Sequence, residues 1–135
     1  MAATASSGER APAGLRGWLG YAAAGALLTA IVAGLASVVL SGPDAAGVRL
    51  GATIAYLLQL CAFGVMAAVV RGGTIFVAAW MGGMLLRFGA LAAVAFWVTR
   101  TGSYPAAATL LGLAGCLFLL LLVEPIFLRE GVRTR

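Results

Sequence analysis

Two charged side chains interrupt apolar segments, and they are the residues whose types and positions suggest chemistry. Arg87 is the only charge in AWMGGMLLRFGALAAVAFW (79–97), and Glu124 is the only carboxylate within an apolar run, in LLLLVEPIFLRE. Ionisable residues inside a membrane usually face the bundle interior, a water-filled cavity or a partner, because a charge is costly there. Arg87 is therefore a candidate docking charge for an acidic group, and Glu124 is its candidate counter-ion.

The residue types that are missing argue against catalysis. The chain has no His, and it also has no Lys and no Asn. Histidine is a frequent general base and the commonest metal ligand. The two cysteines, Cys61 and Cys116, lie inside apolar runs and are expected to be small packing residues. No CxxC, Walker-type glycine loop or GxSxG is present. We therefore expect no enzymatic activity, no cofactor and no metal site.

The overall composition is that of an integral membrane protein. Of the 135 residues, 63% are hydrophobic and 10% are charged, and the mean hydropathy is +1.08. A soluble domain has about 25% charged residues. A chain of this composition could not cover itself with polar surface in water. It is expected to reside in a membrane as a multi-pass protein.

The apolar runs predict an all-α membrane protein with four transmembrane helices in two antiparallel hairpins. Each run is close to or above the roughly 20 residues that a crossing helix needs. The predicted segments are a disordered tail at 1–16, helices at 17–41, 50–70, 74–98 and 105–128, and a basic tail at 129–135. The first run is longer than the core of a cleaved signal peptide. The connections carry turn residues, as in GPDAAGVR (42–49).

Arginine placement predicts the orientation. Six arginines fall on one predicted side and two on the other, with Arg87 left inside the membrane; the six are Arg10, Arg16, Arg71, Arg129, Arg133 and Arg135, and the two are Arg49 and Arg100. The positive-inside rule then places both termini in the cytoplasm. The net charge of +5 suits contact with anionic lipid headgroups. The arginines are dispersed, which disfavours nucleic-acid binding.

Small residues at four-residue spacing predict close helix packing, because membrane helices associate through flat faces. The candidate packing residues are Ala22, Ala26, Ala30 and Gly34 in the first helix, Gly82, Gly83 and Gly89 in the third, and Gly112, with Ala108 and Cys116, in the fourth. These faces would serve either internal packing or a partner helix. Tyr21 and three other aromatic residues near helix ends, Trp18, Trp97 and Tyr104, are expected at the membrane interface.

The relation between the two charges depends on how the last two helices fold together. Folding them about the centre of residues 99–104 places Arg87 near the midplane and opposite Cys116. Glu124 is then about 12 Å away along the axis. A direct ion pair would need tilt or water. The alternative is an interfacial Glu124 beside Arg129, in a helix that Pro125 weakens.

The last two helices resemble a known family. The run W–GG–LLRF around Arg87, and a proline-led final helix ending EP–FL at Glu124, resemble ATP synthase protein I. The resemblance implies a small accessory protein of the bacterial cell inner membrane that assists assembly or stability of the c-subunit ring; magnesium supply is a further proposed role. Arg87 corresponds to a basic residue of the family's third helix, and it would neutralise the acid of a docking c subunit.

Other functions stay open. A structural or interaction protein with an unknown partner is the main alternative, and the oligomeric state is undetermined. Small multidrug exporters also have four helices, but they need a deep carboxylate in the first helix, which has none here. Dimeric fluoride channels share the GG–LR pattern, yet they depend on pore-lining asparagine, which this chain lacks. Transport is therefore the weaker prediction.

Overall fold

The computed structural model describes the backbone of residues 13–70 and 76–133, and all of it folds into helices and short turns. The helices are α1 (Ala13–Val39), α2 (Gly42–Val70), α3 (Phe76–Thr101) and α4 (Ala106–Arg133). Each is long and apolar enough to cross a membrane. The prediction of an all-helical protein with four membrane-length helices is confirmed. The predicted tail up to residue 12 lies outside the described residues.

The connection between α1 and α2 is shorter than the predicted loop at 42–49, because those residues are helical. Gly42 has a φ of 45°, which makes the sharp turn that glycine adopts without strain. Pro43 then falls in the first turn of α2, where a missing N–H has no cost, and Asp44 places a negative charge at the positive end of the helix dipole. Gly42, Pro43 and Asp44, which are common turn residues, therefore form the beginning of α2.

The connection between α3 and α4 is also displaced from its predicted position. α3 ends at Thr101 and is followed by Gly102, whose φ is 61° and whose N–H donates to the Val98 carbonyl at 3.0 Å. This is the left-handed glycine cap common at helix C-termini. At its far end α4 continues past Pro125 to Arg133, so the predicted basic tail is partly helical and the proline does not end the helix.

α2 and α4 form the tightest contact of the bundle. A β-carbon added to Gly112 would lie 2.6 Å from the carbonyl oxygen of Val48, and one added to Gly51 would meet the backbone of Thr109 and Leu113. Only glycine fits where two helix backbones come this close. Gly112 therefore lies in an internal contact, one of the two roles left open for the packing residues, and Cys116 is buried on the same face.

The predicted packing row of α1 points away from this contact. Ala22 is half-buried, but Ala26, Ala30 and Gly34 are exposed, and nothing lies within 4 Å of a β-carbon added to Gly34. The α1 face that contacts the bundle instead carries Tyr21, Gly25, Leu28, Val32 and Ala36. Of the two roles left open for this row, internal packing is therefore not the one that Ala26, Ala30 and Gly34 have in the structure. The row is open to lipid or to another helix.

The small residues of α3 are mostly exposed as well. Nothing lies within 4 Å of a β-carbon added to Gly82 or Gly89, whereas one added to Gly83 would lie 3.8 Å from Nη1 of Arg87. Gly82 and Gly89 are thus not used in internal packing. Gly83 leaves space along the helix for the arginine side chain.

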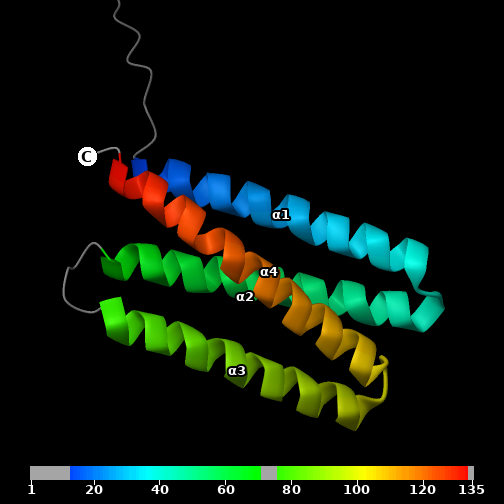
Figure 1. Ribbon diagram of the computed structural model, residues 1–135. Helices are drawn as coiled ribbons and strands as arrows, with labels where there is room; N and C mark the ends of the chain where they lie inside the picture. Colours follow the sequence, from blue (N-terminus) through cyan, green and yellow to red (C-terminus); the bar gives the residue numbers. More distant parts are fainter. Residues whose placement is uncertain (1–12, 71–75, 134–135) are drawn as a thin grey trace, which may run out of the picture.

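Figure 1 shows how the helices are arranged around the α2–α4 pair. α4 crosses α2 obliquely, from the end of α3 to the beginning of α1. α1 contacts α2 and α4 from one side and α3 contacts them from the other, and α1 and α3 have no described contact. The buried apolar core lies between α2 and α4, at Ala52, Ala55, Leu113, Cys116, Leu117 and Leu120.

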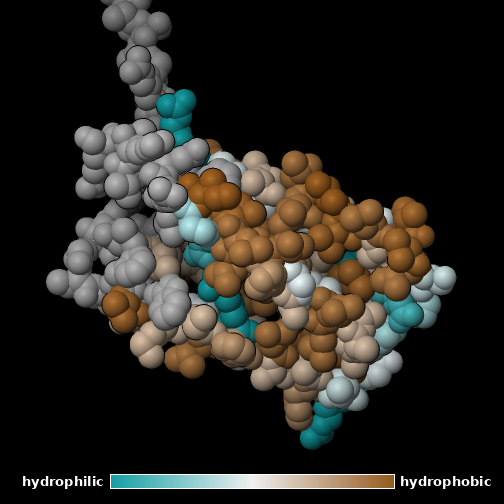
Figure 2. Space-filling model, viewed as in Figure 1, coloured by the Kyte–Doolittle hydropathy of each residue, from teal (hydrophilic) through white to brown (hydrophobic). Residues whose placement is uncertain are grey.

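The outer surface is apolar, as a lipid environment requires. Leucine, valine and phenylalanine side chains are exposed along all four helices. Figure 2 shows a mostly hydrophobic face with hydrophilic atoms at its ends and in one narrow band near the region drawn in grey. An exposed apolar surface of this extent in water would drive aggregation. The structure therefore supports a multi-pass membrane protein.

Candidate functional site

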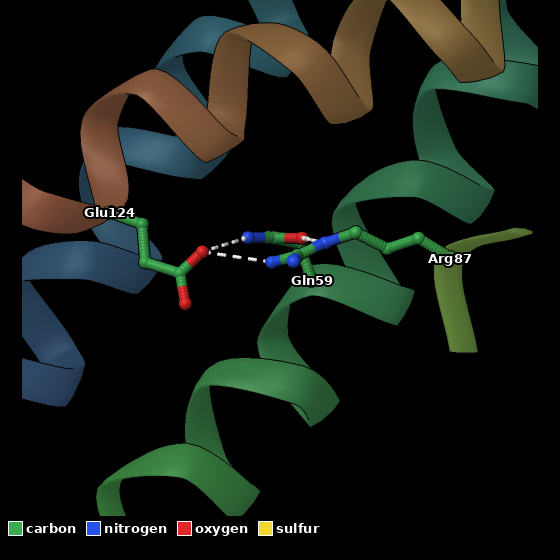
Figure 3. A network of polar contacts seen from close by, with 3 residues as sticks. All are labelled: Gln59, Arg87 and Glu124. Carbon is green, nitrogen blue, oxygen red and sulfur yellow. Dashed lines mark hydrogen bonds and ion pairs between the residues drawn. The ribbon is translucent and has the colours of Figure 1, made fainter. Parts of the chain in front are cut away.

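The side chains of Gln59, Arg87 and Glu124 meet inside the bundle, one from each of α2, α3 and α4 (Figure 3). Arg87 Nη2 donates to Glu124 Oε2 at 2.8 Å, and Gln59 Nε2 donates to the same oxygen at 3.0 Å. Arg87 Nε donates to Gln59 Oε1 at 3.1 Å. The three contacts close a ring, which we call the polar triad.

The ion pair between Arg87 and Glu124 corrects the predicted separation of about 12 Å. Because α3 ends at Thr101 and α4 begins at Ala106, Arg87 falls opposite Leu120 and not Cys116. Leu120 is one helical turn from Glu124, or about 6 Å along the axis.

Side-chain direction closes the remaining distance. Side chains of an α-helix lean toward its N-terminus. α3 and α4 run in opposite directions (Figure 1), so the Arg87 and Glu124 side chains lean toward each other along the bundle axis. Two long side chains then span one turn without water. The alternative contact with Arg129 lies outside the described side chains.

The packing stripes of α2 and α4 lead directly to the polar triad. On α2, Gly47, Gly51, Ala55 and Gln59 follow one another at four-residue spacing, and all are buried. On α4 the corresponding series is Ala108, Gly112, Cys116, Leu120 and Glu124. Residues four apart lie on one helix face. The contact that brings the backbones together through glycine therefore also aims Gln59 and Glu124 at each other.

α1 closes the site with an aromatic side chain. Tyr21 is 1% exposed, and its ring stacks on Phe63 of α2 with the centroids 4.1 Å apart. The Tyr21 hydroxyl lies within reach of the Gln59 side chain. Tyr21 is therefore buried inside the bundle and does not face its outer surface. Each of the four helices contributes one polar side chain to this region, and all are buried except Arg87, which is partly buried.

The polar triad is nearly dry and has no net charge. The side chains of Arg87 and Glu124 are 13% and 7% exposed, and Gln59 is completely buried. A buried charge needs both a partner of opposite sign and hydrogen bonds. Arg87 and Glu124 are each other's partner of opposite sign. Gln59 adds hydrogen bonds by donating to the carboxylate and accepting from the guanidinium. The arrangement is a stable, closed contact between helices.

The described residues offer little for other chemistry. No group of three or more His, Cys, Asp or Glu side chains is placed to hold a metal ion within them. Cys116 is buried, with its sulfur 3.7 Å from the Thr29 hydroxyl, and Cys61 is exposed on another face. Cys116 therefore agrees with the predicted packing role, whereas Cys61 is exposed and does not. The polar triad is the one place in the described part of the chain where ionisable groups converge in the membrane-spanning region.

Two features of the site were not predicted from the sequence. The Gly47–Gly51 row was missed because Gly47 lies within the turn-like sequence at 42–49. Gln59, the only glutamine of the chain, is recognisable from the sequence as a polar group within an apolar run, but its contact with both charges is not. No protein-family model, curated protein or solved structure matches this chain. The resemblance to ATP synthase protein I stays a prediction from residues.

Proposed function

We propose that this chain is a non-enzymatic accessory protein of the bacterial inner membrane that assists assembly of the F-type ATP synthase membrane sector. In this proposal the helices insert as two consecutive antiparallel hairpins, with both chain ends in the cytoplasm. The partner is the c subunit suggested by the sequence resemblance. The observation that carries the proposal is the position of Arg87, a guanidinium in the membrane-spanning region whose carboxylate partner belongs to a neighbouring helix.

The geometry changes how the arginine would engage a partner. Arg87 is already paired with Glu124. An acidic group of a c subunit would therefore have to replace Glu124 as the partner of Arg87. Exchange of one carboxylate for another keeps the arginine neutralised throughout, which avoids an unpaired charge in hydrocarbon. Gln59 is held on α2 and would hydrogen-bond the incoming carboxylate as it does Glu124.

The proposal predicts opposite effects for the two members of the ion pair. In membranes that contain tagged chain and c subunits, Arg87→Leu should lower the amount of c subunit that co-purifies by about tenfold, the equivalent of ~1.4 kcal/mol of binding free energy. Glu124→Gln should leave co-purification unchanged or raise it, because it removes the carboxylate that competes for Arg87.

The matched control is Arg100→Leu. Arg100 lies at the opposite end of α3, over the ring of Phe96 at 4.8 Å, and has no role in the proposed contact. Its replacement should leave co-purification unchanged. If Arg87→Leu and Glu124→Gln reduce c-subunit recovery equally, the ion pair serves only the fold and the docking role is rejected.

A further inference from the structure

α3 is the least embedded helix of the bundle. Val98 is its one fully buried apolar residue among those described. Leu91 and Val94 are only half-buried against the core. α3 has no described contact with α1, and Figure 1 shows it diverging from α4 toward the end at which α3 begins. Among the described side chains of α3, apolar packing is therefore found mainly near the C-terminal end.

The opposite half of α3 is held by a polar contact. The described hydrogen bonds and ion pairs that join α3 side chains to other helices all come from Arg87. Arg87 precedes Val98 by eleven residues, or about 16 Å along the helix. The turn after Val98 contains Gly102 in the left-handed conformation, and the rings of Trp97 and Tyr104 on its two sides have centroids 6.5 Å apart. α3 thus has an apolar attachment beside a glycine turn and a separate polar attachment far from it.

We propose that α3 is a hinged helix, pivoting near Val98 and Gly102, and that the polar triad is the latch that holds it against α2 and α4. The latch opens when Glu124 loses its negative charge or when another acidic group takes Arg87. Opening tilts the first half of α3 away and uncovers Gln59 and Glu124. This inference concerns the chain alone and does not depend on the identity of any partner.

The chemistry around Glu124 explains why its charge controls the latch. The groups that face it are Arg87 from α3, Gln59 from α2 and Tyr21 from α1. Arg87 carries the only opposite charge among them, and neither Gln59 nor neutral Tyr21 can replace a carboxylate. Once Glu124 is neutral, Arg87 lacks a partner of opposite charge, and its long side chain can extend toward the end of the bundle at which α3 begins, at Phe76, eleven residues or about 16 Å away.

Distances between spin labels test the hinge in lipid nanodiscs. In a background with Cys61→Ala and Cys116→Ala, one label pair joins exposed positions 77 and 19 at the latch end of α3 and α1. A second pair joins exposed positions 96 and 35 near the pivot. A third joins exposed positions 57 and 122 on α2 and α4.

Glu124→Gln should lengthen the 77–19 distance by about 5 Å, one helical turn, and broaden its distribution. The other two distances should not change. The exchanged pair Arg87→Glu with Glu124→Arg should restore the parent distribution, because it re-forms the latch with reversed charges. An unchanged 77–19 distance in Glu124→Gln overturns the proposal. Equal broadening of all three distances also overturns it, since the polar triad would then hold the whole bundle and not α3.

Discussion

At the scale of single residues, the polar triad shows how an arginine is accommodated among apolar helices. Insertion scales assign an arginine at a helix centre about 2.5 to 3.5 kcal/mol of unfavourable free energy. The chain offsets this by placing a carboxylate 2.8 Å away and a carboxamide that contacts both charges. Each member of the triad therefore depends on the other two, which makes their contributions to stability non-additive.

This dependence predicts the outcome of a double-mutant cycle between Arg87 and Glu124. Glu124→Leu leaves a buried arginine without its counter-ion and should lower the free energy of unfolding by about 3 kcal/mol. The double replacement Arg87→Leu with Glu124→Leu should cost clearly less than the sum of the two single changes, because it removes both charges. The measurement is reversible unfolding in mixed micelles. Additive losses would show that the two side chains do not interact in the membrane.

At the scale of helices, the bundle is built on the contact between α2 and α4, which are not consecutive in the sequence. The glycines on these two helices let the backbones approach, and the same faces continue into Gln59 and Glu124. The arrangement differs from two hairpins that each pack mainly on themselves. α1 and α3 are peripheral helices that cover opposite sides of the α2–α4 pair (Figure 1).

Glycine substitutions should separate packing glycines from exposed ones. Gly112→Ala would place a methyl group 2.6 Å from the Val48 carbonyl oxygen, so the backbones of α2 and α4 must move apart. We expect a loss of about 1 to 3 kcal/mol in the free energy of unfolding, as for overpacked cores. Gly34→Ala is the matched control, because nothing lies within 4 Å of the added atom. Equal stability of the two variants in micelles would contradict the α2–α4 contact.

The sequence was sufficient to predict the helices but not their contacts. Long apolar runs predict crossing helices because the backbone N–H and C=O groups have no water to bind in the bilayer, and a helix satisfies them within the segment. The start of α2 was missed because Gly42, Pro43 and Asp44 suit both a turn and a helix N-terminus. The Arg87–Glu124 contact was missed because a two-residue change in the turn centre moves the opposing position by a full turn, and because the lean of side chains was not considered.

At the scale of the whole molecule, the polar triad lies closer to one end of the bundle than to the other. Glu124 is eighteen residues from the start of α4 and nine from its end, or about 27 Å and 14 Å along the axis. α1 begins and α4 ends at the nearer end (Figure 1). The proposed orientation would therefore place the triad nearer the cytoplasm, within reach of water on that side after α3 tilts.

Labelling from the two sides of the membrane tests this orientation. Ser41 and Ser103 lie in the two short turns at the same end of the bundle, and both are exposed, whereas Arg16 lies in the first turns of α1 at the opposite end. Cysteines introduced at positions 41 and 103 should react with a membrane-impermeant maleimide added to intact spheroplasts. A cysteine at position 16 should react only after the membrane is opened. The positive-inside rule gives this direction because the sequence predicts six arginines on the side of the chain ends and two on the other. Labelling of position 16 in intact spheroplasts, with positions 41 and 103 protected, would reverse the orientation and place the latch of α3 toward the outside.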